Sequence, residues 1–229
     1  MSRIILKISG EALKDNKNNV ANENLNIILE TINLLKKYNH QVAIVIGGGN
    51  FFRGRENTHM DVITRDTIGM IGTIMNALYI KDYLEKNMLK TSISTPFSFP
   101  ELIGELSKEE IKHKFDNGEV IIFGGGVGKS GYSTDSGVIL ASDMVDADFI
   151  IKMTNVDGVY DSDPRINPNA KKIDKLTYKE ILNNKYNVMD LYAIKEAMNR
   201  NIKILVLNFK DYKKVENYFN GEIIGTEVK

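Results

Sequence analysis

The sequence predicts an α/β fold in which a mainly parallel central sheet lies between two layers of helices, a three-layer αβα sandwich. Two observations lead to this prediction. Short apolar runs of strand length alternate along the chain with longer stretches whose apolar residues recur at helical spacing. The chain also has 229 residues with 42% hydrophobic content, which is enough for one domain with a sizeable core. We therefore expect a single domain over residues 1–229.

The expected strands are apolar and rich in isoleucine and valine, as in strands that are buried on both faces of a parallel sheet. They comprise residues 4–8, 41–46, 91–94, 120–123, 149–153 and 204–207. A helical pattern separates each strand from the next, and the expected helices comprise residues 25–38, 62–86, 108–115, 136–145 and 188–199. This alternation predicts that the sheet is parallel and covered on both faces.

Several helix ends can be read from the sequence. Ser107 and Glu110 have the spacing of a capping box, so a helix should begin after Ser107. The Asp-Asn-Gly run at residues 116–118 should end the same helix before the next strand. In the long helix, four apolar residues recur at positions i, i+3, i+4 and i+7, and we expect all four in the core: Ile71, Ile74, Met75 and Leu78.

Composition excludes several classes of protein. Lys and Arg number 30, as do Asp and Glu, so no global positive field exists to hold a nucleic-acid backbone. No cysteine is present, and His40, His59 and His113 do not have metal-ligand spacing, so we assign no residue as a metal ligand. No apolar stretch approaches the ~18 residues of a membrane span, and residues 3–8 are strand-like rather than a signal peptide. We expect a cytoplasmic protein that does not bind membranes.

Glycine is concentrated after three of the strands. Residues 47–54 and 124–131 each contain a run of glycines with one basic residue, Arg53 or Lys129, and Ser9-Gly10 follows Lys7. Glycine at such turns lets backbone N–H groups converge on an anion. Tight strand-to-helix turns explain one or two of these segments. All three at one edge of a sheet predict a phosphate-binding site.

Two familiar phosphate motifs do not account for these glycines. The Walker motif would need glycine at position 123, where the chain has Phe123. The dinucleotide pattern G-x-G-x-x-G fits residues 126–131, but residues 151–153, about 20 positions later, contain no acidic residue for the ribose. That match alone leaves a dehydrogenase open as an alternative.

Ser133, Thr134 and Asp135 begin the helix that follows the glycine-rich segment at residues 124–131. One interpretation is an ordinary helix N-cap with an acidic first turn. The other is an anion site at a helix N-terminus, in which Ser133 and Thr134 contact phosphate oxygens. Because a carboxylate would repel phosphate, Asp135 must then hold a cation, either Lys7 or Mg²⁺ through water.

Asp66, Gly69 and Met70 share one face of the long helix. A carboxylate beside a position without a side chain suits a ribose diol lying close to the helix. The alternative is close helix–helix packing at the glycines at 69 and 72, with Asp66 solvated. The sequence leaves both interpretations open.

The order of these motifs resembles the amino acid kinase family, and within it the branch that phosphorylates UMP. The matching segments are residues 7–13 (KISGEAL), 47–54 (GGGNFFRG), 66–70 (DTIGM), 133–135 (STD), 154–160 (TNVDGVY), 163–164 (DP) and 188–191 (VMDL). The resemblance implies a transfer of the γ-phosphoryl group of ATP to UMP with Mg²⁺, in pyrimidine nucleotide synthesis, and it suggests a homohexamer. No protein base is implied, because the acceptor is already an ionised phosphate.

The resemblance also implies roles for individual residues, carried over from the family's motifs. The implied catalytic residues are Lys7, Arg53 and Asp135. The implied ATP-binding residues are Lys7, Ile8, Ser9, Gly10, Gly49, Arg53, Thr154, Asn155, Tyr160 and Asp163. The implied UMP-binding residues are Gly48, Asp66, Val127, Gly128, Lys129, Ser130, Gly131, Tyr132, Ser133 and Thr134. Residues up to about 145 would form an acceptor-binding lobe, and residues from about 146 a nucleotide-binding lobe.

Two segments depart from the family's pattern. Val127 and Lys129 stand where many members have the Thr and Asn that can address uracil. Residues 15–20 lack the glycine- and acid-rich character of members that GTP activates, so we expect little effect of GTP, whereas UTP could inhibit by occupying the UMP pocket. Two alternatives remain: a related kinase acting on a carboxylate such as N-acetylglutamate, and a nucleotide-binding regulator without catalysis.

Overall fold

The structure is a computed structural model that describes residues 1–15, 20–99, 103–164 and 166–229. Within these residues, eight strands form one sheet in the order β3-β4-β2-β1-β5-β9-β10-β8. Their bounds are β1 (Arg3–Ile8), β2 (Gln41–Ile46), β3 (Thr91–Ser94), β4 (Val120–Phe123), β5 (Phe149–Thr154), β8 (Lys175–Leu176), β9 (Lys203–Asn208) and β10 (Thr226–Val228). The strands from β3 to β9 in this order are parallel, and β10 is antiparallel to β9. A separate ribbon pairs β6 (Val159–Tyr160) with β7 (Lys172–Ile173).

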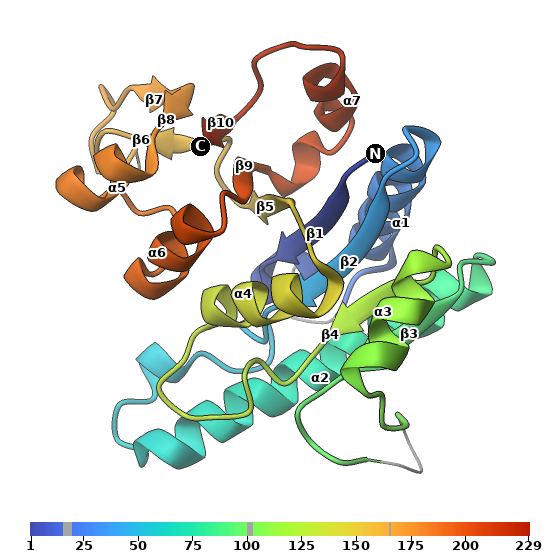
Figure 1. Ribbon diagram of the computed structural model, residues 1–229. Helices are drawn as coiled ribbons and strands as arrows, with labels where there is room; N and C mark the ends of the chain where they lie inside the picture. Colours follow the sequence, from blue (N-terminus) through green and yellow to red (C-terminus); the bar gives the residue numbers. More distant parts are fainter. Residues whose placement is uncertain (16–19, 100–102, 165) are drawn as a thin grey trace.

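Helices cover both faces of the sheet, which confirms the three-layer αβα prediction (Figure 1). One face packs against α1 (Asn22–Lys37), α2 (Val62–Lys86) and α7 (Lys214–Phe219). The other packs against α3 (Lys108–Asp116), α4 (Thr134–Val145), α5 (Tyr178–Asn184) and α6 (Leu191–Asn199). Short 3-10 turns η1 (Gly10–Leu13), η2 (Gly54–Glu56) and η3 (Phe209–Asp211) follow β1, the second glycine-rich segment and β9.

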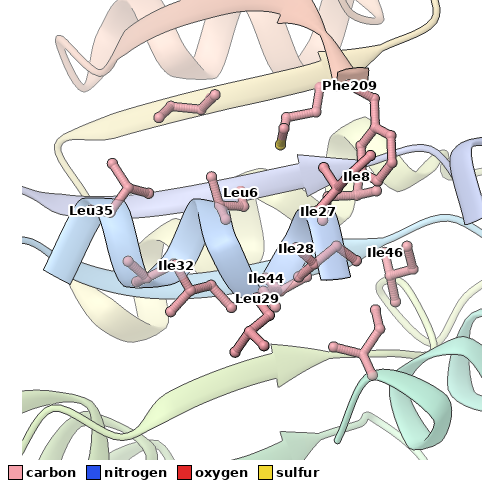
Figure 2. Packing of buried hydrophobic residues seen from close by; sticks show 14 of the residues in the cluster. Leu6, Ile8, Ile27, Ile28, Leu29, Ile32, Leu35, Ile44, Ile46 and Phe209 are labelled. Atoms are coloured by element: carbon pink, nitrogen blue, oxygen red, sulfur yellow. The ribbon is translucent and has the colours of Figure 1, made fainter. Parts of the chain in front are cut away.

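The side chains of β1 alternate between the two hydrophobic clusters. Leu6 and Ile8 lie in the cluster with α1, whereas Ile5 lies in the cluster with α4. Figure 2 shows Leu6 and Ile8 with Ile44 of β2 against the apolar face of α1. Lys7 therefore shares the face of Ile5, the face on which α4 lies.

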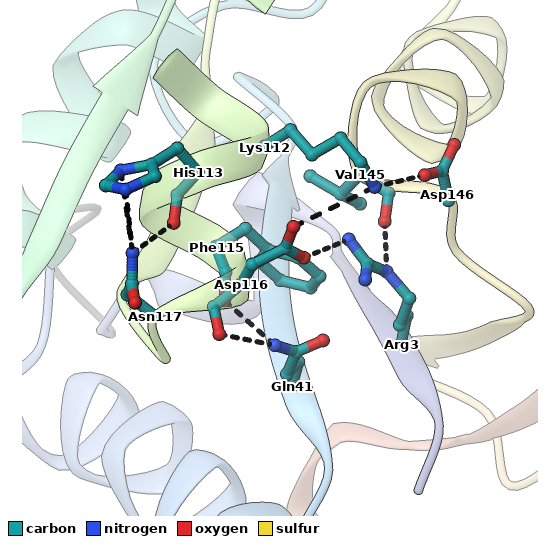
Figure 3. A network of polar contacts seen from close by, with 9 residues as sticks. All are labelled: Arg3, Gln41, Lys112, His113, Phe115, Asp116, Asn117, Val145 and Asp146. Atoms are coloured by element: carbon teal, nitrogen blue, oxygen red, sulfur yellow. Dashed lines mark hydrogen bonds and ion pairs between the residues drawn. The ribbon is translucent and has the colours of Figure 1, made fainter. Parts of the chain in front are cut away.

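A polar network fastens the amino ends of the strands to the ends of two helices (Figure 3). Arg3 forms an ion pair with Asp116 at 2.7 Å and donates through Nε to the carbonyl of Val145. Gln41 donates to the carbonyls of Phe115 and Asp116, both at 3.1 Å. These contacts orient α3 and α4 from the edge of the sheet opposite the glycine-rich loops, so the two edges have separate roles.

The predicted strands are confirmed to within one residue at each end. The capping box at Ser107 is present, and α3 ends at Asp116 as expected. The helix expected at 188–199 begins at Leu191 instead, because Asp190 is its N-cap and accepts from the N–H of Ala193 at 2.8 Å. The short elements α5, α7, β6, β7, β8 and β10 were not predicted.

The apolar stripe of the long helix was wrongly assigned to the core. Only Ile74 is buried, whereas Ile71, Met75 and Leu78 are between 41% and 47% exposed. The inward face of α2 is instead formed by Ala77, Ile80 and Leu84, with which the sheet side chains make contact. An apolar stripe at helical spacing indicates an amphipathic helix but does not distinguish a core face from an exposed apolar face.

Gly225 offers a test of the packing between β9 and β10. It has φ +57°, and a Cβ placed on it would lie 2.1 Å from the carbonyl oxygen of Val206. We expect Gly225→Ala to lower the free energy of unfolding by more than about 2 kcal/mol, measured by urea unfolding. The matched control is Gly221→Ala, because Gly221 also has positive φ but no heavy atom within 4 Å of the new Cβ. The control should cost only about 1 kcal/mol, and equal costs for the two variants would contradict the steric argument.

Candidate functional site

The helix α2 holds two of the three glycine-rich segments in place. Asn76, which is fully buried, donates to the carbonyl of Gly47 at 2.7 Å and exchanges hydrogen bonds of 2.7 and 2.9 Å with the amide of Asn50. Thr73 accepts from the N–H of Gly125 at 2.6 Å. The loops after β2 and β4 are therefore fixed to the same helix, three residues apart along it.

The glycine-rich segment after β2 also lies at backbone contact distance from Gly10 after β1 and from Gly69 of α2. A Cβ on Gly10 would lie 2.5 Å from the carbonyl oxygen of Gly47, and one on Gly48 would lie 2.6 Å from the carbonyl oxygen of Gly69. Because β1, β2 and β4 are parallel, their loops meet at one edge of the sheet, as predicted. In the sheet, β2 and β5 lie on opposite sides of β1. Such a switch in strand order opens a crevice at the carboxyl edge of a parallel sheet.

Two lysines lie side by side at this edge. Lys7 of β1 and Lys152 of β5 are direct partners in the strand register. Asp135, in the first turn of α4, lies 3.0 Å from Lys7 Nζ and 3.6 Å from Lys152 Nζ. All three side chains are no more than 16% exposed. The predicted pairing of Asp135 with Lys7 is confirmed, and Lys152 joins it.

The charges in this cluster shift one another's ionisation. Burial and then the charge of Lys7 lower the pKa of Lys152 to about 8. Burial alone raises the pKa of Asp135, but the charges of Lys7 and Lys152 outweigh it and hold the pKa below its ordinary value. At neutral pH the cluster has two ammonium groups and one carboxylate, so its net charge is positive and faces the crevice edge.

Asp190 connects the start of α4 to the start of α6. Its Oδ2 accepts from the hydroxyls of Ser133 and Ser136, while its Oδ1 caps α6. Lys152 also donates to the carbonyl of Val188, just before this cap. Ser133 is itself the N-cap of α4, accepting from the N–H groups of Asp135 and Ser136. The capping interpretation of Ser133 is thus confirmed, and Ser133 and Thr134 both line the adjoining pocket.

Arg53 lies in the loop after β2 and is held by two carboxylates. Its guanidinium is 3.0 Å from Glu11 and 2.9 Å from Glu56. The hydrogen bond that Arg53 donates to Glu56, followed by the charge of Glu11, raises the pKa of Arg53 further above the ordinary value, so it is permanently charged. The side chain is 28% exposed, so this cation stands at the rim of the crevice rather than inside it.

A cavity of about 500 Å³ lies between the two loops held by α2. Its wall includes Gly48 and Arg53 from the loop after β2, Asp66 and Gly69 from α2, and Thr134 at the start of α4. A Cβ on Gly69 would meet no heavy atom within 4 Å, whereas one on Gly72 would lie 3.4 to 3.6 Å from atoms of Gly48 and Phe51. Gly69 therefore opens the cavity, whereas Gly72 packs against the loop after β2 and not against another helix, so the helix–helix packing considered for these glycines is wrong.

Asp66 does not stand free in the cavity wall. Its Oδ2 accepts from the hydroxyl of Ser130 at 2.6 Å and from the N–H of Gly131 at 2.8 Å. The bond from Ser130, followed by that from Gly131, holds the pKa of Asp66 below its usual value. Its Oδ1 lies 3.8 Å from Nε of Arg65.

Other residues of the third loop line different spaces. Val127 and Tyr132 line both the large cavity and a smaller one of about 240 Å³ beside α6. Lys129 lines the smaller one, with Tyr192 and Arg200. Gly128 packs against Pro96. The segment thus forms a partition, with Lys129 on the side away from Gly69.

Most of the residues matched to ATP lie at the carboxyl ends of β1, β2 and β5, whereas Tyr160 belongs to β6 of the separate ribbon and Asp163 follows it. Ile8 is fully buried, so only its backbone can meet a ligand, and Ser9 precedes η1. Thr154 ends β5, and the carbonyl of Asn155 accepts from Asn208 at 3.1 Å. Asn155 also lines a polar cavity of about 630 Å³ near Glu11. Further along, Tyr160 donates to Asp157 at 2.7 Å, and Asp163 accepts from the backbone N–H groups of 166 and 167 through its carbonyl.

Four positioning residues were missed from the sequence: Glu11, Asn76, Lys152 and Asp190. Two carried a readable signal. Lys152 interrupts an otherwise apolar strand, and Asn76 interrupts the inward face of an apolar helix, and buried polar groups of this kind need partners. Asp190 and Glu11 lie within two of the matched motifs, residues 188–191 and 7–13, but their partners could not be read from the sequence because they are distant in the chain.

Some expectations fall outside these contacts. Residues 16–19 of the segment considered for GTP lie outside the described residues. Within the described part of the chain, no group of three or more His, Cys, Asp and Glu side chains is placed to hold a metal ion. A search of the same residues finds no helix both long and apolar enough to span a membrane.

Comparison with known proteins gives a consistent result. Residues 2–208 match the profile of the amino acid kinase family. A uridylate kinase from Thermosipho melanesiensis is 37% identical over 227 residues, covering 99% of this chain and 97% of that protein.

Solved structures agree with the sequence comparison. A UMP kinase from Bacillus anthracis superposes with a TM-score of 0.93 at 32% identity, covering 100% of this chain and 96% of that one. A UMP kinase from Ureaplasma parvum gives a TM-score of 0.91 at 33% identity, covering 100% and 98%.

The lysine cluster predicts a pH-dependent stability. We expect Asp135→Asn to lower the free energy of unfolding by about 3 kcal/mol at pH 7, because it leaves two buried ammonium groups without their counter-charge. Because the pKa of Lys152 is about 8, this cost should shrink between pH 7 and pH 9.5, as Lys152 loses its proton in the wild type and with it the attraction to Asp135.

Urea unfolding of both proteins across that pH range measures the effect. The matched control is Asp143→Asn, which removes the half-exposed partner of Arg200 and should cost under about 1 kcal/mol at every pH. A pH-independent cost for Asp135→Asn would show that Lys152 is not the titrating group.

Proposed function

Since this chain belongs to the amino acid kinase family, we propose that it catalyses the reversible transfer of the γ-phosphoryl group of ATP to UMP, giving UDP and ADP. The reaction belongs to pyrimidine nucleotide synthesis, and we propose the cytoplasm as its place. The observation that carries the proposal is the cavity above Gly69. The cavity has the carboxylate of Asp66 on one side, and the glycine-rich backbone at Gly48 with the cation of Arg53 on the other. This arrangement fits a molecule with a sugar diol and a phosphate.

The proposed binding mode follows the charges. The phosphate of UMP lies against Gly48 and near Arg53 and Thr134, and its ribose lies over Gly69 with its hydroxyls at Asp66. The base lies toward Val127 and the third loop. The ATP phosphates lie along Ser9, Gly10 and Gly49, so the two nucleotides meet beside Lys7.

The proposed catalysis is electrostatic. The phosphate of UMP is already an ionised nucleophile, so no side chain is required as a base. Lys7 and Lys152 lie where charge moves from the attacking to the leaving oxygen, and Asp135 keeps both oriented. Mg²⁺ would be held mainly by phosphate oxygens of ATP and would add charge neutralisation. This fits the site, because its buried carboxylate, Asp135, is already paired with Lys7 and Lys152.

Assembly and regulation are further parts of the proposal. The exposed stripe of Ile71, Met75 and Leu78 on α2 supports association with further copies of the chain, which we propose to be a homohexamer. The UMP site would lie in a lobe before about residue 145. The ATP site would combine Ser9, Gly10 and Gly49 of that lobe with Thr154 and Asn155 of the lobe after it, and the two lobes share one sheet. UTP would inhibit by occupying the UMP pocket.

A coupled assay of ADP release tests the function directly. UMP, CMP, dUMP and N-acetylglutamate are compared side by side with ATP and Mg²⁺. Turnover with UMP above the other acceptors supports the proposal. Preference for acetylglutamate would assign a carboxylate kinase instead, and absence of turnover with every acceptor would favour a nucleotide-binding regulator.

Lys7→Ala should reduce kcat in this assay by about 10²-fold or more, because it removes a cation from the transferring phosphoryl group. The change must be separated from unfolding, since Lys7 is also a partner of Asp135. The melting temperature of the variant is therefore measured alongside. A folded variant with near-normal kcat would remove Lys7 from the mechanism.

Gly69→Leu should raise the KM for UMP by more than about tenfold, because the new side chain enters the space that Gly69 leaves open. Asp66→Ala should act in the same direction by removing an acceptor for the ribose hydroxyls. The KM for ATP serves as the internal control in both variants and should change little. Equal effects on both substrates would place the cavity outside the UMP site.

A further inference from the structure

Ser130, in the glycine-rich loop at residues 124–131, connects this loop to α2 through a side-chain contact. Here the hydroxyl donates to Asp66 Oδ2 at 2.6 Å, across 64 positions of sequence. The adjacent N–H of Gly131 donates to the same oxygen at 2.8 Å.

These two bonds engage only one of the two carboxylate oxygens of Asp66. Both fall on Oδ2, whereas Oδ1 has, among the described residues, only the more distant Nε of Arg65 at 3.8 Å. A carboxylate has room for about four donors, so Oδ1 can still accept from a ligand. The orientation of the group is then set by the loop rather than by the ligand.

The contact is compatible with an occupied site. With the bond between Ser130 and Asp66 in place, the cavity lined by Asp66 and Gly69 still measures about 500 Å³. A loop that closed the site would fill this space. The bond therefore supports the open cavity, and a ligand need not displace it.

We propose that Ser130 is a positioning residue for sugar recognition: it fixes Oδ2 of Asp66 so that Oδ1 faces the ribose hydroxyls of the acceptor nucleotide. This rests on the proposed function, since it refines how UMP is held. A second consequence concerns the sugar itself. A carboxylate that is oriented before the ligand binds gains more binding free energy from the two hydroxyls of ribose than from the single hydroxyl of deoxyribose. Ser130 therefore favours UMP over dUMP.

The experiment compares Ser130→Ala, Ser130→Thr and the wild type in the ADP-release assay with UMP and with dUMP. Loss of one hydrogen bond to a charged group should raise the KM for UMP about fivefold to tenfold. The KM for dUMP should rise less, so the preference for UMP falls, and kcat should change less than twofold. Ser130→Thr retains the hydroxyl and should restore both the KM and the preference.

Thr67→Ala is the matched control. Thr67 is next to Asp66 on α2, and among the described residues its hydroxyl donates only to the carbonyl of Ile63 within the helix. Its removal should leave both KM values unchanged.

Three results would overturn the inference. A lower KM for UMP in Ser130→Ala would mean that the hydroxyl competes with ribose for Asp66. An unchanged preference between UMP and dUMP, with wild-type turnover intact, would refute the role of Ser130 while leaving the proposed function standing. A wild-type protein that turns over neither nucleotide would overturn both.

Discussion

Two lysines occupy directly opposed positions on adjacent parallel strands, and one carboxylate between them makes this possible. Without Asp135, Lys7 and Lys152 would be two ammonium groups buried beside each other. With it, one charge is balanced and the other is left facing the sheet edge where phosphate would bind. The start of α4 must then lie directly over β1 and β5. The crossover from β4 to β5, the cap at Ser133 and the bridge through Asp190 all serve that placement.

The site is also built at a cost to α2. Glycine at 69 and 72 destabilises a helix by roughly 1 kcal/mol at each position relative to alanine. The structure uses them differently, since Gly69 leaves space and Gly72 admits the backbone of Gly48. Asn76, at the next turn, offsets part of this cost by fastening the same loop with hydrogen bonds. Gly69, Gly72 and Asn76 of α2 therefore all serve the site: Gly69 borders the cavity, and Gly72 and Asn76 contact the loop after β2.

The layers and most strands could be predicted because each strand is a compact apolar run, and burial on both faces leaves little ambiguity. The short elements after residue 158 could not, because strands of two or three residues and helices of six or seven show too little periodicity. At the site, the residues beside glycine were recognisable, and charge predicted a cation beside Asp135, with Lys7 and Mg²⁺ as the two candidates. The partners of Arg53 and Asp66 were not predictable, since Glu11 and Ser130 meet them only through the folded loops.

The cations of the site differ in how readily a ligand can take them over. Arg53 is partly exposed and so are both of its carboxylate partners, and ion pairs of that kind contribute little to stability. A phosphate can replace Glu11 or Glu56 at little cost. The lysine cluster is buried, and removing its carboxylate would be strongly unfavourable, so a ligand must bind beside Asp135 rather than in its place. The fixed lysines therefore suit the reacting phosphoryl group, whose position must not vary, whereas the exchangeable arginine suits capture of the incoming anion at the rim.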